Sequence, residues 1–157
     1  MRGLHLTADL RGCAAARPLM TVPAALRSIC LEAVAAAGLT PVGELFHRFS
    51  PTAGLDASDA TGPAGITGVV LLAESHLAVH TWPELEAATL DVYVCNLGAD
   101  NSARAEALLA GLLAAFAPRT VERHALERGA VDAPAAASTT AAAPSSTTPP
   151  ARASMPR

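Results

Sequence analysis

The chain has 157 residues, a formal net charge of −3, and 51% hydrophobic but only 3% aromatic residues. This length allows one domain with a substantial core. The charge provides no basic surface for nucleic acid or an anionic membrane, and no apolar run approaches the ~20 residues that span a bilayer. No signal peptide is expected, and Cys13, Cys30 and Cys95 lack Cys-x-x-Cys spacing. We therefore expect a cytoplasmic protein with reduced thiols and no nucleic-acid or membrane partner.

The first part of the chain predicts a strand, a helix and a second strand. Residues 4–10 alternate apolar and polar side chains, which is typical of a half-buried strand. Thr21 is expected to cap a helix that ends at Gly38. Residues 41–49 predict the second strand, and residues 52–64 are small, polar and turn-forming, so they predict a loop.

Three more strands, a helix and a last strand complete the predicted domain. The strands are expected at 66–73, 77–82, 89–95 and 119–128, and the helix between Asp100-Asn-Ser102 and Pro118. This order, β-α-β-β-β-β-α-β, predicts an α+β two-layer sandwich with a mainly antiparallel sheet and two helices on one face. Residues 1–130 form the predicted domain. Residues 131–157 are rich in Ala, Ser, Thr and Pro, so we expect a disordered tail.

One face of the sheet is expected to collect imidazoles, a thiol and aromatic rings. Side chains alternate between the two faces along a strand, and the aliphatic positions should meet the helices. The opposite face then carries His80, Trp82, Tyr93 and Cys95, with His5 and Phe49 beside them. Such a face is typical of a pocket or a subunit interface.

The stretch Glu74-Ser75-His76 lies at the junction of two buried strands, where polar groups are costly without partners. A metal site is not predicted, because His76 and His80 lie roughly 13 Å apart along a strand and no third ligand has a clear spacing. A serine hydrolase is not predicted either, because Ser75 lacks the Gly-x-Ser-x-Gly elbow.

The sequence Gly65-Ile-Thr-Gly-Val-Val-Leu-Leu-Ala-Glu-Ser-His-Leu-Ala-Val-His-Thr-Trp-Pro-Glu84, followed by Asp91-Val-Tyr-Val-Cys95, resembles the prokaryotic S-adenosylmethionine decarboxylase proenzymes. The resemblance extends to Gly3-Leu-His-Leu, His47-Arg-Phe and Glu127-Arg-Gly129. It has two departures. Residues 52–64 form an insertion, and Leu85-Glu86-Ala87 replaces the Tyr-Gly-Tyr that is common in the family.

The resemblance implies that the chain cleaves itself. The Ser75 hydroxyl attacks the carbonyl of Glu74, and the chain breaks there into residues 1–74 and 75–157. Ser75 becomes a covalent pyruvoyl group, the only cofactor implied, and no metal is expected. This ketone forms an imine with the substrate amine and accepts electrons as CO2 leaves.

Motif positions also imply the roles of individual side chains. His80 matches the base that removes the serine α-proton, and Thr67 stands where the family usually has a serine that assists processing. Cys95 matches the proton donor, and a thiol can serve as an acid at neutral pH. The side chains expected to bind substrate are Phe49, which would stack on adenine, Glu84, which would hold the ribose hydroxyls, and Trp82.

The implied function is decarboxylation of S-adenosylmethionine, which provides the aminopropyl donor for spermidine synthesis. The family also implies a homodimer or higher assembly whose active sites draw residues from both protomers. One alternative is the same pyruvoyl chemistry on ornithine or arginine, because this chemistry needs only an α-amino acid. Another is an unprocessed, non-catalytic paralogue that acts as a binding protein. The intact Glu74-Ser75 pair, with His80 and Cys95, argues against the paralogue.

Overall fold

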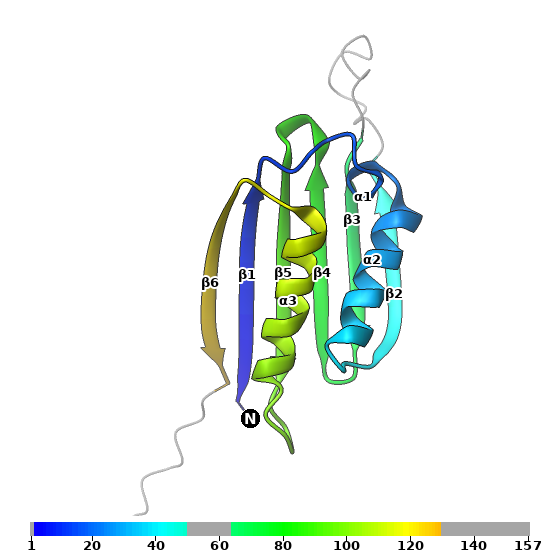
Figure 1. Ribbon diagram of the computed structural model, residues 1–157. Coiled ribbons are helices and arrows are strands. Elements are labelled where there is room, and N and C mark those ends of the chain that lie inside the picture. The colour runs from blue at the N-terminus through cyan, green and yellow to red at the C-terminus, as the bar shows by residue number, and fades with distance from the viewer. Residues whose placement is uncertain (1, 50–63, 130–157) are drawn as a thin grey trace, which may run out of the picture.

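The computed structural model describes residues 2–49 and 64–129. They form two layers, a six-stranded sheet and a layer of helices on one of its faces (Figure 1). The predicted α+β architecture is confirmed. Residues 52–63 of the predicted insertion and the predicted tail at 131–157 lie outside the described residues, so the domain boundary at residue 130 stays a prediction.

The sheet is antiparallel throughout. Its strands are β1 (Gly3–Arg11), β2 (Pro41–Arg48), β3 (Ile66–Leu72), β4 (Ser75–Trp82), β5 (Ala87–Cys95) and β6 (Thr120–Arg128). Their order across the sheet is β2-β3-β4-β5-β1-β6. The pairs β3–β4 and β4–β5 are hairpins of neighbouring strands, whereas β1 lies between two strands from much later in the chain.

The helical layer consists of α1 (Pro18–Thr21), α2 (Pro23–Ala36) and α3 (Ser102–Phe116), and a short 3-10 helix, η1 (Pro83–Leu85), follows β4. The sequence pattern predicts α2 and α3 but neither α1 nor η1. The predicted cap at Thr21 is wrong, because Thr21 ends α1 and Val22 occupies the N-cap of α2. Pro18 and Pro23 each begin a helix, since the fixed φ of proline suits the first helical position.

The core lies between α2, α3 and the sheet, and alternation along β4 shows how it forms. Leu77 and Val79 point into this layer and are fully buried, each removing apolar surface worth roughly 1.5–3 kcal/mol from water. Thr81 is also fully buried, but its hydroxyl donates to the Met20 carbonyl at 2.8 Å and accepts from the Ile66 amide at 2.9 Å. These contacts satisfy the hydroxyl and tie α1 to β3 and β4.

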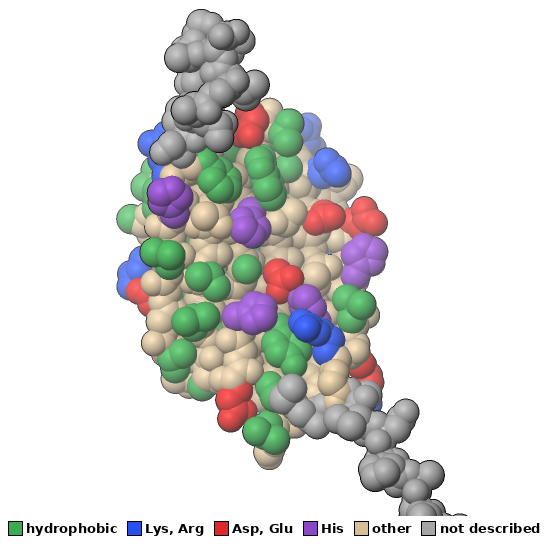
Figure 2. All heavy atoms as spheres, turned by 180° about the vertical axis from the view of Figure 1, so that it is seen from behind, with side chains coloured by type: hydrophobic (Ala, Val, Ile, Leu, Met, Phe, Trp, Pro, Cys, Tyr) green, Lys and Arg blue, Asp and Glu red, His purple; other side chains and the backbone are tan. Residues whose placement is uncertain are grey.

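The other side of the sheet, called the open face here, is covered by none of the helices in the described part of the chain (Figure 2). Apolar side chains that are at least half exposed lie over β2, β3 and β6; they are Leu45, Leu71 and Leu126. Histidines lie on the same face, some near its middle and others toward its two edges (Figure 2). No helix of the described residues has the length and apolar character needed to cross a membrane.

Candidate active site

The hairpin between β3 and β4 holds Glu74 in an unusual conformation. Leu72 pairs with Ser75, so Ala73 and Glu74 form a two-residue turn. Glu74 has a φ of 66°, in the left-handed region that costs a residue with a side chain about 1–2 kcal/mol. The peptide bond between Glu74 and Ser75 therefore follows a strained residue.

The hydroxyl of Ser75 is held by the neighbouring strand. Ser75 begins β4 and Cys95 ends β5, and antiparallel pairing puts these two strand ends side by side. The backbone amide of Cys95 donates a hydrogen bond to Ser75 Oγ at 3.2 Å. Cys95 itself is only 5% exposed. We call Glu74, Ser75 and Cys95 the serine cluster.

A second group of predicted residues lies near the other end of β4. The register of β3 and β4 places Thr67 opposite His80, and Thr67 Oγ1 lies 2.9 Å from His80 Nδ1. The ring of Trp82 lies beside that of His80, with 5.9 Å between the ring centroids and 35° between the planes. We call Thr67, His80 and Trp82 the histidine cluster.

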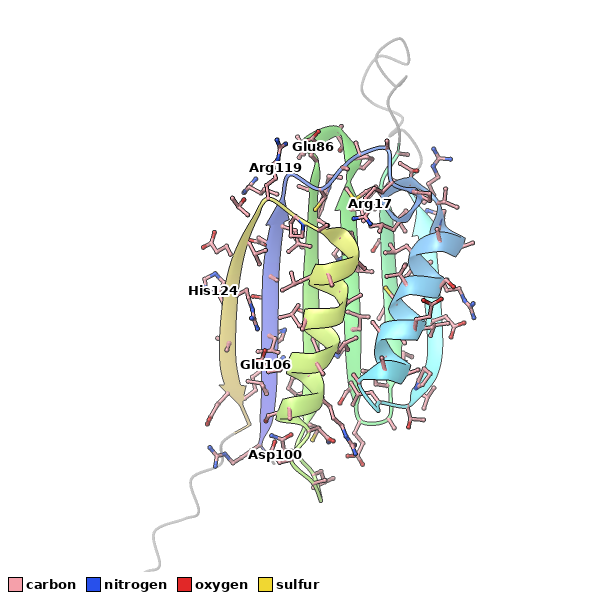
Figure 3. All side chains as sticks on the ribbon, viewed as in Figure 1. Arg17, Glu86, Asp100, Glu106, Arg119 and His124 are labelled. Carbon is pink, nitrogen blue, oxygen red and sulfur yellow. The ribbon has the colours of Figure 1, made fainter. Side chains whose placement is uncertain are left out.

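Phe49 and Glu84 lie at the same end of the sheet as the histidine cluster. The amide of Phe49 donates to the Gly65 carbonyl at 2.9 Å, immediately before β3 begins. Glu84 is exposed in η1, two residues after Trp82. Glu86, in the turn that follows, forms an ion pair at 2.6 Å with Arg119, the residue before β6, and the two side chains point toward each other (Figure 3).

The predicted site residues therefore come together in two groups and not in one. Ser75 and His80 are five residues apart on a continuous strand, which corresponds to ~16 Å. The serine cluster lies near the β3–β4 turn, and the histidine cluster near the β4–β5 turn (Figure 1). Within one chain, His80 does not reach Ser75.

A third cluster occupies the open face between the other two, where the sequence pattern predicts His5 and Tyr93 but not the contacts that they make. His5 Nε2 lies 2.7 Å from one carboxylate oxygen of Asp91, and His76 Nε2 lies 3.4 Å from the other. The second contact is a charge contact without hydrogen-bond geometry, so that oxygen has no hydrogen-bond partner. Arg128 lies over the Tyr93 ring, 5.0 Å from its centroid. The pairing of β1 with β5 creates this cluster, and alternation within one strand gives no signal for it.

The segment just before α3 also contacts the serine cluster. The backbone amide of Ser102 donates to the Asp100 carboxylate at 2.9 Å, and the side-chain and backbone hydrogen bonds from Ser102 lower the pKa of Asp100. Asp100 lies at the end of the sheet where β5 stops (Figure 3). The amide side chain of Asn101 donates to the Cys95 carbonyl at 2.9 Å. The pattern Asp100-Asn-Ser102 predicts only a helix cap and gives no signal for this contact.

The residues around Ser75 suit the pyruvoyl group that the family resemblance implies at this position, and they offer few ligands for a metal ion. The backbone amide of Cys95 already donates a hydrogen bond to the oxygen of Ser75, and the same residue carries a thiol. Among residues 2–49 and 64–129, no three His, Cys, Asp or Glu side chains are placed to hold a metal ion.

Comparison with known proteins gives the family. The S-adenosylmethionine decarboxylase family matches residues 4–129. An S-adenosylmethionine decarboxylase proenzyme of Archaeoglobus fulgidus is 33% identical over 81% of this chain and 97% of its own length. One from Symbiobacterium thermophilum is 37% identical, over 81% and 83%. The crystal structure of the adenosylmethionine decarboxylase from Aquifex aeolicus matches with a TM-score of 0.68 and 32% identity, covering 83% of this chain and 92% of that one. The chain therefore belongs to the S-adenosylmethionine decarboxylase family.

Proposed function

We propose that the protein is a self-processing, pyruvoyl-dependent decarboxylase of S-adenosylmethionine that acts in the cytoplasm and supplies the aminopropyl donor for spermidine synthesis. The observation that carries the proposal is the hydrogen bond from Cys95 to the Ser75 hydroxyl in a chain of this family. The relatives from Archaeoglobus fulgidus and Symbiobacterium thermophilum are named S-adenosylmethionine decarboxylase proenzymes, which accords with both the activity and the self-cleavage.

Self-cleavage breaks the bond between Glu74 and Ser75. The Ser75 hydroxyl attacks the Glu74 carbonyl carbon, the C–N bond breaks and an ester forms. Removal of the Ser75 α-proton then expels the Glu74 carboxylate, which takes the serine oxygen with it. Water supplies the new ketone oxygen at residue 75 and ammonia leaves. The left-handed conformation of Glu74 favours this step, because breaking the bond releases the strain of the turn.

In the decarboxylation, the ketone at residue 75 supplies a carbonyl that binds the substrate amine and accepts the electrons released with CO2. The Cys95 amide, which donates to the Ser75 hydroxyl, would hold the group formed there. The Cys95 thiol belongs to the same residue and is buried, so it can deliver a proton without competition from bulk water. This supports Cys95 as the proton donor.

His80 and Thr67 suit the removal of the Ser75 α-proton. The Thr67 hydroxyl lies within hydrogen-bond distance of His80 Nδ1 and fixes the orientation of the ring. Threonine keeps the hydroxyl that the family usually takes from serine at this position. The distance along β4, however, requires that these two residues act on the Ser75 of another chain.

A homodimer joined through the open faces meets this requirement. In a two-fold dimer the same surface of both chains is in contact, so the serine cluster of one chain can meet the histidine cluster of its partner. The exposed Leu45, Leu71 and Leu126 support burial of this face against a second copy. Each dimer then contains two composite sites.

The side chains near the histidine cluster support S-adenosylmethionine over ornithine or arginine. Phe49 and Trp82 offer aromatic surfaces for a purine ring. The exposed carboxylate of Glu84 can accept hydrogen bonds from ribose hydroxyls. An aliphatic amino acid has neither a purine nor a ribose, so it would leave these groups without a partner.

The test is to follow the mass of the purified chain. We expect two fragments, residues 1–74 and 75–157, with a blocked amino terminus at residue 75, while Ser75→Ala stays at full length. CO2 should be released from carboxyl-labelled S-adenosylmethionine in preference to ornithine or arginine, and borohydride should trap the substrate on the 75–157 fragment. A chain that never cleaves and releases no CO2 would refute the proposal.

A further inference from the structure

The last residue of β5, Cys95, is held by contacts from outside its strand. Its backbone amide donates to Ser75 Oγ at 3.2 Å, and its carbonyl accepts from Asn101 Nδ2 at 2.9 Å. The next amide, that of Asn96, donates to the Arg2 carbonyl at 2.8 Å. Beyond that point residues 97–100 are exposed. The end of β5 is therefore held on one side by β1 and on the other by Asn101, the residue before α3.

The side chain of Asn101 has only one orientation that satisfies its neighbours. Arg104 donates to Asn101 Oδ1 at 3.1 Å, and a guanidinium can only donate. The Cys95 carbonyl can only accept, so the amide nitrogen of Asn101 must face it. The backbone amide of Asn101 donates in turn to Asn96 Oδ1 at 2.9 Å, which closes a loop of hydrogen bonds around Cys95 and Asn96.

Of the hydrogen bonds that Cys95 makes to Ser75 and Asn101, self-cleavage changes only the one to Ser75. When the chain breaks, the oxygen of Ser75 leaves as part of the Glu74 carboxylate, so the Cys95 amide loses the Ser75 hydroxyl and has to bond instead to the new group at residue 75. The hydrogen bond from Asn101 to the Cys95 carbonyl involves no atom that reacts. It therefore persists in the mature enzyme, where it holds Cys95 together with the pairing of β5 and β1.

We propose that Asn101 is a positioning residue for Cys95, and that its amide holds the thiol-bearing residue at the reaction centre after cleavage has removed the Ser75 hydroxyl. This inference rests on the proposed function of Ser75 and Cys95. It assigns Asn101 no contact with substrate. Its side chain makes no cap hydrogen bond to α3, so the helix does not need it.

The test compares Asn101→Ala with Arg104→Ala. Both variants lose the contact between Asn101 and Arg104, but only the first loses the hydrogen bond to Cys95. Asn101→Ala should cleave itself completely and keep the KM of the wild type. Its kcat should fall by about threefold to tenfold, the rate equivalent of one net hydrogen bond. Arg104→Ala should match the wild type in both constants.

A second readout is independent of activity. Cleavage leaves Cys95 as the only cysteine of the 75–157 fragment, so the mass of that fragment reports its alkylation by iodoacetamide. Asn101→Ala should be alkylated about threefold to tenfold faster than the wild type, because the buried strand end is loosened. Asn101→Asp keeps the shape and the contact with Arg104 but loses the donor, so its kcat should fall at least as far.

The possible results separate the two proposals. If the wild type neither cleaves nor releases CO2, the proposed function is wrong. If the wild type is active but Asn101→Ala has an unchanged kcat, an unchanged alkylation rate, or a higher KM alone, the positioning role of Asn101 is overturned.

Discussion

The three cysteines of the chain are all buried but differ in what burial does to them. Cys30, on the core side of α2, is fully enclosed, and burial raises the pKa of its thiol to about 12. Burial also raises the pKa of Cys13, although the positive charge of the nearby Arg17 opposes it. A thiol that stays protonated is a poor nucleophile, so both are structural residues. Cys95 differs because it adjoins the proposed reaction centre.

The raised pKa of Cys30 predicts a loss of stability in alkali. The thiol ionises near its ordinary value of 9.0 in the unfolded chain but only near 12 in the folded chain. The contribution of the protonated Cys30 thiol to the free energy of unfolding is therefore complete below pH 9. It falls as the pH rises from 9 toward 12, by about 1.4 kcal/mol per pH unit at most.

Urea unfolding of the uncleaved Ser75→Ala chain at about pH 8 and about pH 10 measures this loss. Adding Cys30→Ala should lower the free energy of unfolding at both values but flatten its dependence on pH. If the free energy of unfolding depends on pH equally with and without Cys30, the raised pKa of this thiol is not the cause of the loss.

At the scale of elements, the β3–β4 hairpin departs from the usual turn chemistry. Two-residue turns normally place glycine or asparagine where φ is positive, yet here Glu74 occupies that position. Regular pairing on both sides of the turn, from Thr67–His80 to Leu72–Ser75, holds it in this conformation. Strain kept in place by a rigid hairpin is typical of a functional site.

Replacing Glu74 by glycine should remove this strain. In the uncleaved Ser75→Ala chain, Glu74→Gly should raise the free energy of unfolding by about 0.5–1 kcal/mol, the left-handed penalty less the entropy cost of glycine. In the chain that keeps Ser75, the same change should slow self-cleavage, measured as the rate at which the 1–74 fragment appears.

Ala117 provides the matched control, because it ends α3 with a φ of 45° and lies outside the serine cluster. Ala117→Gly should stabilise the uncleaved chain by a similar amount and leave the cleavage rate unchanged. If Glu74→Gly cleaves as fast as the wild type, strain in the turn does not drive the reaction.

At the scale of the whole molecule, the proposed mechanism makes one chain an incomplete enzyme, because the two clusters lie at the two ends of β4. The proposed dimer predicts that variants with complementary defects restore each other. Ser75→Ala cannot form the pyruvoyl group, and His80→Ala lacks the processing base, so neither should mature alone. When the two are expressed together, the Ser75 of the His80→Ala chain meets an intact His80 from its partner.

Mass spectrometry of the co-expressed chains gives the result. The His80→Ala chain should be cleaved and the Ser75→Ala chain should stay intact, with one of the two composite sites of each mixed dimer active. A chain carrying both changes, co-expressed with His80→Ala, is the control and should give no cleavage. Cleavage of His80→Ala by itself would show that no partner histidine is needed.

Most of the fold could be predicted because each element has a local signature. Alternation along β4 separates Leu77 and Val79 from His76 and His80, and the structure confirms both faces. The start of α2 could not be predicted from Thr21, because Pro18 begins a separate turn of helix just before it. Capping signals compete over such short distances, and tertiary packing decides between them.

The sequence by itself determined the family and the residue types of the site, because the motif from Gly65 to Glu84 is continuous in the chain. Only the tertiary structure decided which of these residues meet. It joined Ser75 to Cys95, joined Cys95 to Asn101, and put His80 at the far end of β4. The physical reason is that a strand rises ~3.3 Å per residue, so neighbours in a motif separate along it, while sheet pairing joins residues that are distant in the sequence.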